Sequence, residues 1–244
     1  MKFLSSAVFW ILYLTVTFSP LVQSADYEFA SIELLVEQEV GRRVLPQIYK
    51  NIGITIDIDP LPAPRAQQAA STGAKAGEIM RIWTYGQETP NTIRVPTPYY
   101  YLETMPFIVK GSGVVINSQA DLAKYQLSKV RGVKHTDNIT RGLNNFYEVN
   151  STKRMFTMLR SYRVDAVLTN TLDGELILTK LGYDNIEATG VPLARLDLYH
   201  YIHKDYQHLV PLVDEEIKRL TANGELAQMI DSAEQYVIRQ ALRR

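Results

Sequence analysis

The feature that most constrains the fold of this chain is the alternation of short β-rich runs with longer stretches of helical periodicity. We expect strands at 54–58, 113–117, 129–135, 165–170 and 197–203. We expect helices at 31–50, 65–72, 138–147, 152–161, 172–181 and 206–239, the last with a break near Asn223 and Gly224. Strands that alternate with helices predict an α/β architecture with mostly parallel sheets.

The N-terminal stretch has the pattern of a secretory signal peptide. Lys2 precedes an almost wholly apolar run from Ala7 to Phe18, and Ser24 lies at a small-residue cleavage position. The run is too short for a membrane-spanning helix, which needs about 20 apolar residues. We therefore expect a cleaved signal peptide at residues 1–24 and export of the remaining chain.

Charge and cysteine content narrow the possible partners and the compartment. The chain has 26 basic and 26 acidic side chains, and cleavage of the leader removes only Lys2 from this balance. A neutral chain does not favour nucleic acid or an anionic membrane as partner. The chain has no cysteine, which excludes disulfides, thiolate metal sites and a cysteine nucleophile. Export without disulfides favours a bacterial periplasm.

The order of several short motifs resembles that of a known family. The motifs are "PAPRAQQAASTGAKAGE", "IRVPTPYYY", "KVRGVKHTDN" and "SYRVDAVLTN", followed by "LTANGELAQMID" near the C-terminus. In this order and spacing the chain resembles the type II, two-lobed class of periplasmic solute-binding proteins that serve polar amino acid transporters. The resemblance covers nearly all of the chain after the leader.

The resemblance implies a two-lobed α/β fold with two hinge crossings. Lobe one would comprise residues 25–103 and 200–244, and lobe two residues 104–199, each a mostly parallel sheet flanked by helices. The crossings would lie near 104–109 and 193–199, with a ligand in the cleft between the lobes. Open parallel sheets bind ligands outside the carboxyl ends of their strands, where several charged residues of this chain are expected.

The first candidate site residues are Arg65, Glu78 and Arg81. The resemblance places ligand contacts at the cleft end of this segment, and a guanidinium group holds a carboxylate through two parallel hydrogen bonds. We expect Arg81 or Arg65 to bind an acidic ligand group. Glu78 and Arg81 are three residues apart, so an alternative is a local ion pair that braces the cleft wall. This alternative is favoured for Glu78 and stays open for Arg81.

A second candidate is the stretch "KHTDN", which follows an expected strand and opens a helix. Exposed amides at a helix start form an anion site, so a ligand carboxylate would be held there with help from Thr136 and from His135 or Lys134. The alternative is ordinary helix capping by Thr136 or Asp137, which is favoured for Asp137.

Asn170 and Tyr99 complete the candidate ligand contacts. Asn170 ends the expected strand 165–170, where the resembled family carries an acidic residue that pairs with a ligand ammonium group. Asn170 lacks that charge. Asp173 and Glu175 are close enough in sequence to substitute for it, but the favoured role of both is to support the start of the next helix through its dipole. This departure weakens the expectation of an α-amino acid ligand. Tyr99 would provide a flat amphipathic wall, or would pack against the hinge.

The sequence does not favour a metal or cofactor site. Three histidines occur at positions 200, 203 and 208, but residues three apart on a strand point to opposite faces, and a metal needs three or four converging ligands. The sequence also has no GxSxG elbow, no HExxH motif and no glycine-rich phosphate loop.

These patterns together predict a monomer that binds a small polar or anionic ligand, amino-acid-like or an organic acid, for an ABC transporter or a membrane sensor. An alternative is a periplasmic enzyme of the dehydratase type on the same scaffold, with Glu78 as acid or base. A third possibility is a protein-interaction module that has lost its small ligand.

Overall fold

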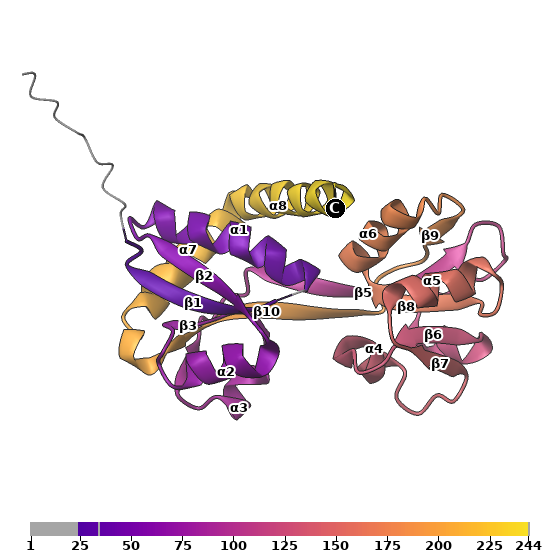
Figure 1. Ribbon diagram of the computed structural model, residues 1–244, viewed down its shortest axis with the longest axis horizontal. Helices are drawn as coiled ribbons and strands as arrows, with labels where there is room; N and C mark the ends of the chain where they lie inside the picture. Colours follow the sequence, from indigo (N-terminus) through magenta and orange to yellow (C-terminus); the bar gives the residue numbers. More distant parts are fainter. Residues whose placement is uncertain (1–23, 34, 244) are drawn as a thin grey trace, which may run out of the picture.

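The computed structural model describes residues 24–33 and 35–243 (Figure 1). The expected signal peptide, apart from Ser24, lies outside these residues. Within the described ranges, no helix combines the length and the apolar character that crossing a membrane requires.

Helices and strands alternate along most of the chain. The strands are β1 (Tyr27–Ile32), β2 (Ile56–Leu61), β3 (Gly77–Ile82), β4 (Thr92–Arg94), β5 (Tyr100–Val109), β6 (Leu127–Val130), β7 (Phe146–Val149), β8 (Ala166–Asn170), β9 (Ile186–Ala188) and β10 (Ala194–His203). The α-helices are α1 (Val36–Asn51), α2 (Ala63–Ser71), α3 (Tyr85–Glu88), α4 (Lys134–Ile139), α5 (Thr152–Arg160), α6 (Thr171–Leu181), α7 (Leu209–Ala222) and α8 (Glu225–Leu242). Short 3-10 helices span Gln119–Lys124 and Lys204–Tyr206.

The strands form one hydrogen-bonded sheet in the order β2-β1-β3-β10-β5-β8-β6-β7, with β4 paired to β10 and β9 to β5. Parallel pairing is confined to the two ends, where β1 pairs with β2 and β3, and β6 with β7 and β8. The long strands β5 and β10 pair antiparallel with each other and with all their other neighbours. The expectation of mostly parallel sheets therefore holds only for the outer strands, because β5 and β10 run in opposite directions between the two ends.

Figure 1 shows two groups of elements joined by the long strands β5 and β10. The first group contains β1–β4, α1–α3 and the C-terminal helices α7 and α8. The second contains β6–β9 and α4–α6. The N-terminal and C-terminal parts of the chain thus build one group together, and the middle of the chain builds the other.

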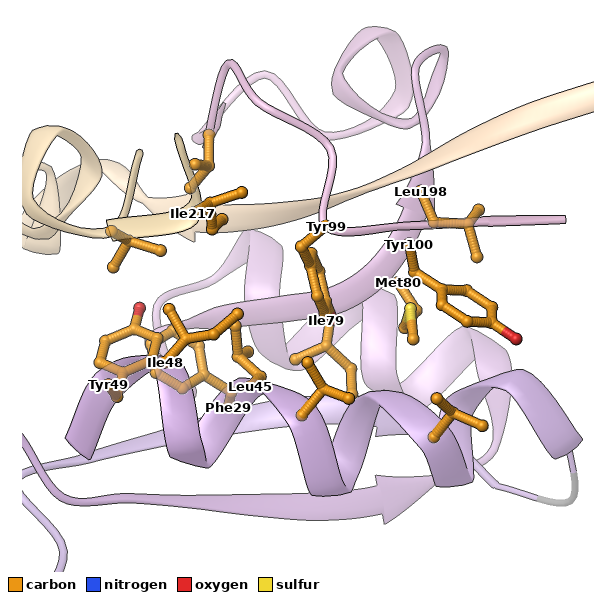
Figure 2. Close-up of a cluster of buried hydrophobic side chains, with 14 of the residues drawn as sticks. Phe29, Leu45, Ile48, Tyr49, Ile79, Met80, Tyr99, Tyr100, Leu198 and Ile217 are labelled. Atoms are coloured by element: carbon orange, nitrogen blue, oxygen red, sulfur yellow. The ribbon is translucent and has the colours of Figure 1, made fainter. Parts of the chain in front are cut away.

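The hydrophobic core is divided in nearly the same way, although Leu172 of α6 packs with the cluster of the first group. The largest cluster of buried side chains lies in the first group, where Phe29, Ile79 and Ile217 of α7 pack with Tyr49 on the inner face of α1 (Figure 2). The main cluster of the second group surrounds Phe156. Each fully buried side chain of this size contributes about 1.5–3 kcal/mol. Each group therefore has its own source of stability.

Several expected elements are confirmed. The helices at 152–161 and 172–181 are α5 and α6, and the strands at 165–170 and 197–203 are β8 and part of β10. The break in the last helix is also confirmed, because α7 ends with Asn223 as its C-cap and Gly224 precedes α8 with a φ of +78°. The expected helix 31–50 begins later, at Val36, since Ser31 and Ile32 still belong to β1.

Three expectations around the middle of the chain are wrong. The stretch 113–117 is not a strand, although Ile116 is buried. The strand expected at 129–135 ends at Val130, because Gly132 turns the chain with a φ of +77°. The helix expected at 138–147 is instead the short α4 followed by β7, and Gly142, with a φ of +84°, lies in the turn between them.

Candidate ligand-binding site

A cavity of about 1250 Å³ lies between the two groups of elements. Its lining includes residues of α1 and β3 from the first group, of α4, β8 and α6 from the second, and of the connecting strand β10. Pockets that enclose a small molecule usually measure about 300–1,000 Å³. The cavity is therefore large enough to admit a small ligand with room to spare.

The cavity lies at the carboxyl ends of the parallel strands. Its lining includes the last residue of each of four strands: Ile32 of β1, Ile82 of β3, Val130 of β6 and Asn170 of β8. Helix α6 follows β8 directly and α1 begins four residues after β1, so both helices start at this edge. This is the place where open α/β sheets bind their ligands, because loops and helix N-termini converge there.

Arg81 lies at the end of β3 and lines the cavity with a side chain that is 19% exposed. Its Nη1 is 3.4 Å from Oε1 of Glu78, and its guanidinium carbon lies 4.5 Å from the centre of the Tyr85 ring. The preceding residue, Met80, has a φ of +53°, which non-glycine residues rarely adopt. Arg81 thus forms the local ion pair that its spacing from Glu78 allowed, and it also faces the cavity.

Glu78 is enclosed behind Arg81. Its side chain is 0% exposed, and the Tyr85 hydroxyl donates a hydrogen bond to Oε2. Burial raises the pKa of Glu78, and this effect outweighs the Arg81 charge and the Tyr85 hydrogen bond, which both lower it. Because Glu78 is not part of the cavity lining, a molecule in the cavity would meet Arg81 before this carboxyl group.

Trp83 is an aromatic wall that the sequence analysis did not identify. It follows β3 directly, is 57% exposed and lines the cavity. The guanidinium carbon of Arg94 lies 3.1 Å from the Trp83 ring centre, and the Tyr199 ring meets Trp83 edge-on at 6.0 Å between centroids. The sequence signal that could have identified Trp83 was its position just after the last residue of a buried strand. An exposed indole held in this way provides a flat apolar surface for a ligand.

On the second group, α4 begins at Lys134 with Val133 as its N-cap. Capping by Thr136 or Asp137 is therefore a wrong expectation, because both lie inside the helix. The buried Thr136 hydroxyl donates to the Val133 carbonyl at 2.9 Å, and Asp137 accepts from Lys129 at 2.5 Å. In this arrangement both polar groups stabilise the helix and its packing.

His135 lines the cavity although its side chain is largely buried, with 8% of the residue exposed. Its Nδ1 shares a hydrogen bond with the Thr104 hydroxyl at 2.8 Å. Burial lowers the pKa of His135 to about 4, so the ring is neutral near pH 7. His135 therefore offers the cavity a neutral imidazole.

Asn170 both lines the cavity and caps α6. Its side-chain oxygen accepts a hydrogen bond from the Asp173 amide at 2.8 Å. The Asp173 carboxylate lies in the first turn of α6 and accepts hydrogen bonds from the Thr152 and Thr169 hydroxyls at 3.0 and 2.9 Å. Asn170 thus fixes where α6 starts, and with it the position of Asp173 at the cavity.

Replacing Asn170 with alanine is expected to lower the free energy of unfolding by about 1 kcal/mol, since an N-cap hydrogen bond is lost. Asn170→Asp is the matched control, because aspartate also accepts from the Asp173 amide. Urea denaturation of the three proteins measures the difference. Equal losses in both variants would show that the cap is not the role of Asn170.

The remaining candidate residues lie away from the cavity. Arg65 is exposed on α2, and Tyr99 is buried in the core of the first group, where it packs with Ile79 (Figure 2). Among the predicted residues the lining contains Arg81, His135 and Asn170, whereas Arg65, Glu78, Tyr99 and Thr136 do not contribute to it.

The three histidines near the C-terminal strand have separate environments. His200 is fully buried, with Nε2 2.9 Å from the Tyr49 hydroxyl, and burial lowers its pKa to about 3. His203 is mostly buried beside Asp205, and His208 lies 3.1 Å from the Tyr27 hydroxyl. Across residues 24–33 and 35–243, no group of three or more histidine or acidic side chains has an arrangement that could hold a metal.

The lining of the cavity is acidic overall. It contains the carboxylates of Glu37, Glu88, Asp137, Asp173 and Asp197 and the guanidinium groups of Arg81 and Arg195. With His135 neutral, negative side chains outnumber positive ones by five to two. This distribution does not favour a purely anionic ligand.

No family model matches the chain. An uncharacterized protein of Shewanella oneidensis is 22% identical over 181 residues, which cover 71% of this chain and 67% of that protein.

Solved structures are similar over most of the chain. The GluR0 ligand-binding core in complex with L-glutamate has a TM-score of 0.66 and 13% identity, covering 86% of this chain and 98% of that one. The amino acid ABC transporter substrate-binding protein AbpA of Streptococcus pneumoniae, bound to L-arginine, has a TM-score of 0.58 and 15% identity over 87% and 95%. A histidine kinase sensor domain similar to periplasmic binding proteins has a TM-score of 0.57 and 13% identity over 83% and 93%.

The structural similarity establishes the fold, but at these low sequence identities it does not identify the ligand. The resemblance inferred from the order of the sequence motifs is confirmed at this level, since several of the structural neighbours are substrate-binding proteins of amino acid ABC transporters. The chain has the α/β fold of the type II periplasmic binding proteins.

Proposed function

We propose that this protein captures a small polar solute between two hinged lobes and presents the closed complex to a membrane partner. The observation that carries this proposal is the cavity at the strand ends, which residues of both groups line together. The proposed ligand contacts are Arg81, Trp83, His135 and Asn170. Arg81 and Trp83 would act from lobe one, and His135 and Asn170 from lobe two.

The proposed lobes follow the division of the core. Lobe one comprises residues 25–103 and 200–244, and lobe two residues 104–199, so the chain crosses within β5 and β10. Each lobe has a main hydrophobic cluster, although Leu172 and Leu198 of lobe two pack in the cluster of lobe one, and the β3–β10 register is irregular between Tyr199 and Tyr201, beside the second crossing. A main core in each lobe and two connecting strands would permit rotation of one lobe against the other.

Ligand binding would favour the closed form because the ligand makes more contacts there than in the open form. A ligand in the open cleft touches one lobe, whereas in the closed cleft it touches both, and this extra interaction energy shifts the population. A cavity of about 1250 Å³ exceeds the size of a small-molecule pocket, as expected for the open form.

The membrane partner is proposed as an ABC transporter or a sensor, since structural neighbours of both kinds share the fold. Export to the periplasm through the N-terminal leader would place the protein where such partners collect their solutes. We propose that it acts there as a monomer and that it releases its ligand unchanged, because the enclosed Glu78 is poorly placed to act on a molecule in the cavity.

Thermal denaturation against a metabolite library tests the proposal. A ligand at 100 times its Kd is expected to stabilise the protein by about 2.7 kcal/mol. Mass spectrometry of the recovered compound should show no chemical change, whereas a converted compound would indicate an enzyme. If no amino acid, amine, organic acid or short peptide stabilises the protein, solute capture is wrong.

A further inference from the structure

The Trp83 ring is exposed at the cavity and is held from its other side. Trp83 is 57% exposed and lines the cavity together with Tyr199. Arg94 is not part of the lining, although its guanidinium carbon lies 3.1 Å from the centre of the Trp83 ring and 4.8 Å from that of the Tyr199 ring. The guanidinium group therefore covers one face of the indole from outside the cavity and leaves the other face open.

Two neighbouring residues of paired strands fix the position of Trp83. Arg94 of β4 lies directly opposite Tyr201 of β10 in the antiparallel register, so their side chains are neighbours on one face of the sheet. The Tyr201 hydroxyl donates a hydrogen bond to the Trp83 carbonyl at 2.7 Å. Gly86 permits this packing, because a Cβ there would lie 3.2 Å from the Tyr201 ring. Tyr201 thus fixes the backbone at Trp83, while Arg94 stacks on its ring.

Stacking is the interaction that holds the Arg94 side chain. In the part of the chain that the structure describes, Arg94 forms no ion pair with a carboxylate, and its buried Nε has no hydrogen-bond partner. A guanidinium group is planar and less strongly hydrated than an ammonium group, so it stacks well on aromatic rings. The positive charge of Arg94 is therefore left to the electron-rich faces of Trp83 and Tyr199.

The charge of Arg94 also acts on the open face of the ring. A group stacked on that face would lie about 7 Å from the guanidinium carbon, because stacked atoms are about 3.5–4.0 Å apart and Arg94 lies 3.1 Å from the ring centre on the other side. This distance is shorter than the Debye length of about 8 Å at physiological salt, so the charge is not screened across the ring. A second cation on the open face would be repelled, whereas an uncharged or electron-rich group would not.

We propose that Arg94 is a positioning residue for ligand binding, although it does not line the cavity. It holds the Trp83 ring in one orientation, and its charge reserves the open face of the ring for an uncharged or electron-rich part of the ligand. This inference rests on the proposed function and names a residue that determines specificity at the same site. The ring is rigid before the ligand arrives, so binding does not have to immobilise it.

Intrinsic fluorescence tests the rigidity of the ring without a ligand. The chain has two tryptophans, so in a Trp10→Phe background the signal comes from Trp83, whether or not the leader is cleaved. Exposed side chains usually change rotamer within picoseconds to nanoseconds. Time-resolved anisotropy should nevertheless show the Trp83 ring moving with the whole molecule. Arg94→Met, which keeps an unbranched side chain and removes the guanidinium group, should add a sub-nanosecond component.

Charged quenchers test the effect of Arg94 on the open face. Iodide and caesium ions quench an exposed tryptophan by contact, so the ratio of their quenching constants depends on the local charge. This iodide-to-caesium ratio should fall about twofold or more in Arg94→Met, because a unit charge about 7 Å away acts on the two ions in opposite directions. Arg94→Lys keeps the charge without the planar group, so it should retain the ratio but not the full immobilisation of the ring.

The matched control is Arg43→Met. The guanidinium carbon of Arg43 lies 3.3 Å from the centre of the Tyr236 ring, but neither residue lines the cavity. The control loses the same kind of contact and should leave the anisotropy and quenching of Trp83 unchanged. Compounds that stabilise the natural protein should bind Arg94→Met with a Kd raised about 2- to 10-fold, the cost of immobilising one side chain, and the control within about twofold. Denaturation curves check that each variant is folded.

The outcomes separate this inference from the function on which it rests. Anisotropy, quenching or ligand affinity that Arg94→Met leaves unchanged would overturn the positioning role while solute capture stands, and so would equal changes in Arg43→Met. If Arg94→Met does not fold, the anisotropy and affinity of Arg94→Lys decide in the same way. The absence of any stabilising compound would overturn solute capture, and with it the role of Arg94 in binding, whatever the fluorescence shows.

Discussion

Replacing Arg81 with alanine is expected to lower the free energy of unfolding by about 3–5 kcal/mol. The change removes the positive partner of Glu78, whose side chain is 0% exposed, and loss of one member of a buried ion pair has a cost of this size. The Tyr85 hydroxyl remains as a hydrogen-bond donor but carries no charge. Urea denaturation at pH 7 measures the loss.

The double variant Arg81→Ala/Glu78→Gln is the control for this mechanism. A neutral amide needs no counter-ion, so the double variant should be more stable than Arg81→Ala alone. The loss in Arg81→Ala should also shrink as the pH falls. Burial already raises the pKa of Glu78 in the natural protein, and a protonated Glu78 has no charge that needs Arg81. Equal stability of the single and double variants at pH 7 would show that the pair contributes little.

Gly77→Ala is the second substitution with a large expected effect, a loss of about 3 kcal/mol or more. A Cβ at this position would lie well inside contact distance of the Tyr201 carbonyl oxygen and 2.9 Å from the Ile202 Cα. These are backbone atoms of β10, which cannot move away as a flexible side chain can. Because β3 carries both Glu78 and Arg81, displacing the strand would also weaken ligand binding.

Gly53→Ala is the matched control. Gly53 also has a positive φ, +77°, but a Cβ there would have no atom within 4 Å. Its replacement should lower the free energy of unfolding by only about 1 kcal/mol, the backbone cost of a left-handed conformation. Similar losses in the two variants would show that the contact with β10 is not what requires a glycine at position 77.

Most helices and several strands were predictable because they depend on local patterns. The amphipathic spacing of α1, the break at Gly224 and the run that becomes β8 are each encoded within a few residues. The candidate residues at strand ends were also predictable from local patterns. Two of them, Arg81 and Asn170, line the cavity. Tyr99 looked equally suitable in sequence, but its place in the core of the first group of elements depends on residues from distant parts of the chain.

The features that the sequence did not predict depend on long-range pairing. The antiparallel centre of the sheet forms because β5 and β10, far apart in sequence, lie next to each other. The presence of Glu37 and Asp173 in one cavity lining likewise depends on α1 and α6 starting at the same edge of the sheet. Each carboxylate alone has the pattern of an ordinary first-turn acid, so the sequence did not identify either as a lining residue.

Closure of the two lobes over a ligand is the central claim, and a distance measurement tests it directly. The chain has no cysteine, so Gln87→Cys in α3 and Asn144→Cys after α4 can be spin-labelled without further changes. Both positions are exposed, and Figure 1 shows α3 and α4 on the same side of the connecting strands. With a stabilising ligand from the screen at saturation, pulsed electron paramagnetic resonance should give a distance shorter by more than about 2 Å and a narrower distribution. An unchanged distribution in the saturated protein would contradict the account.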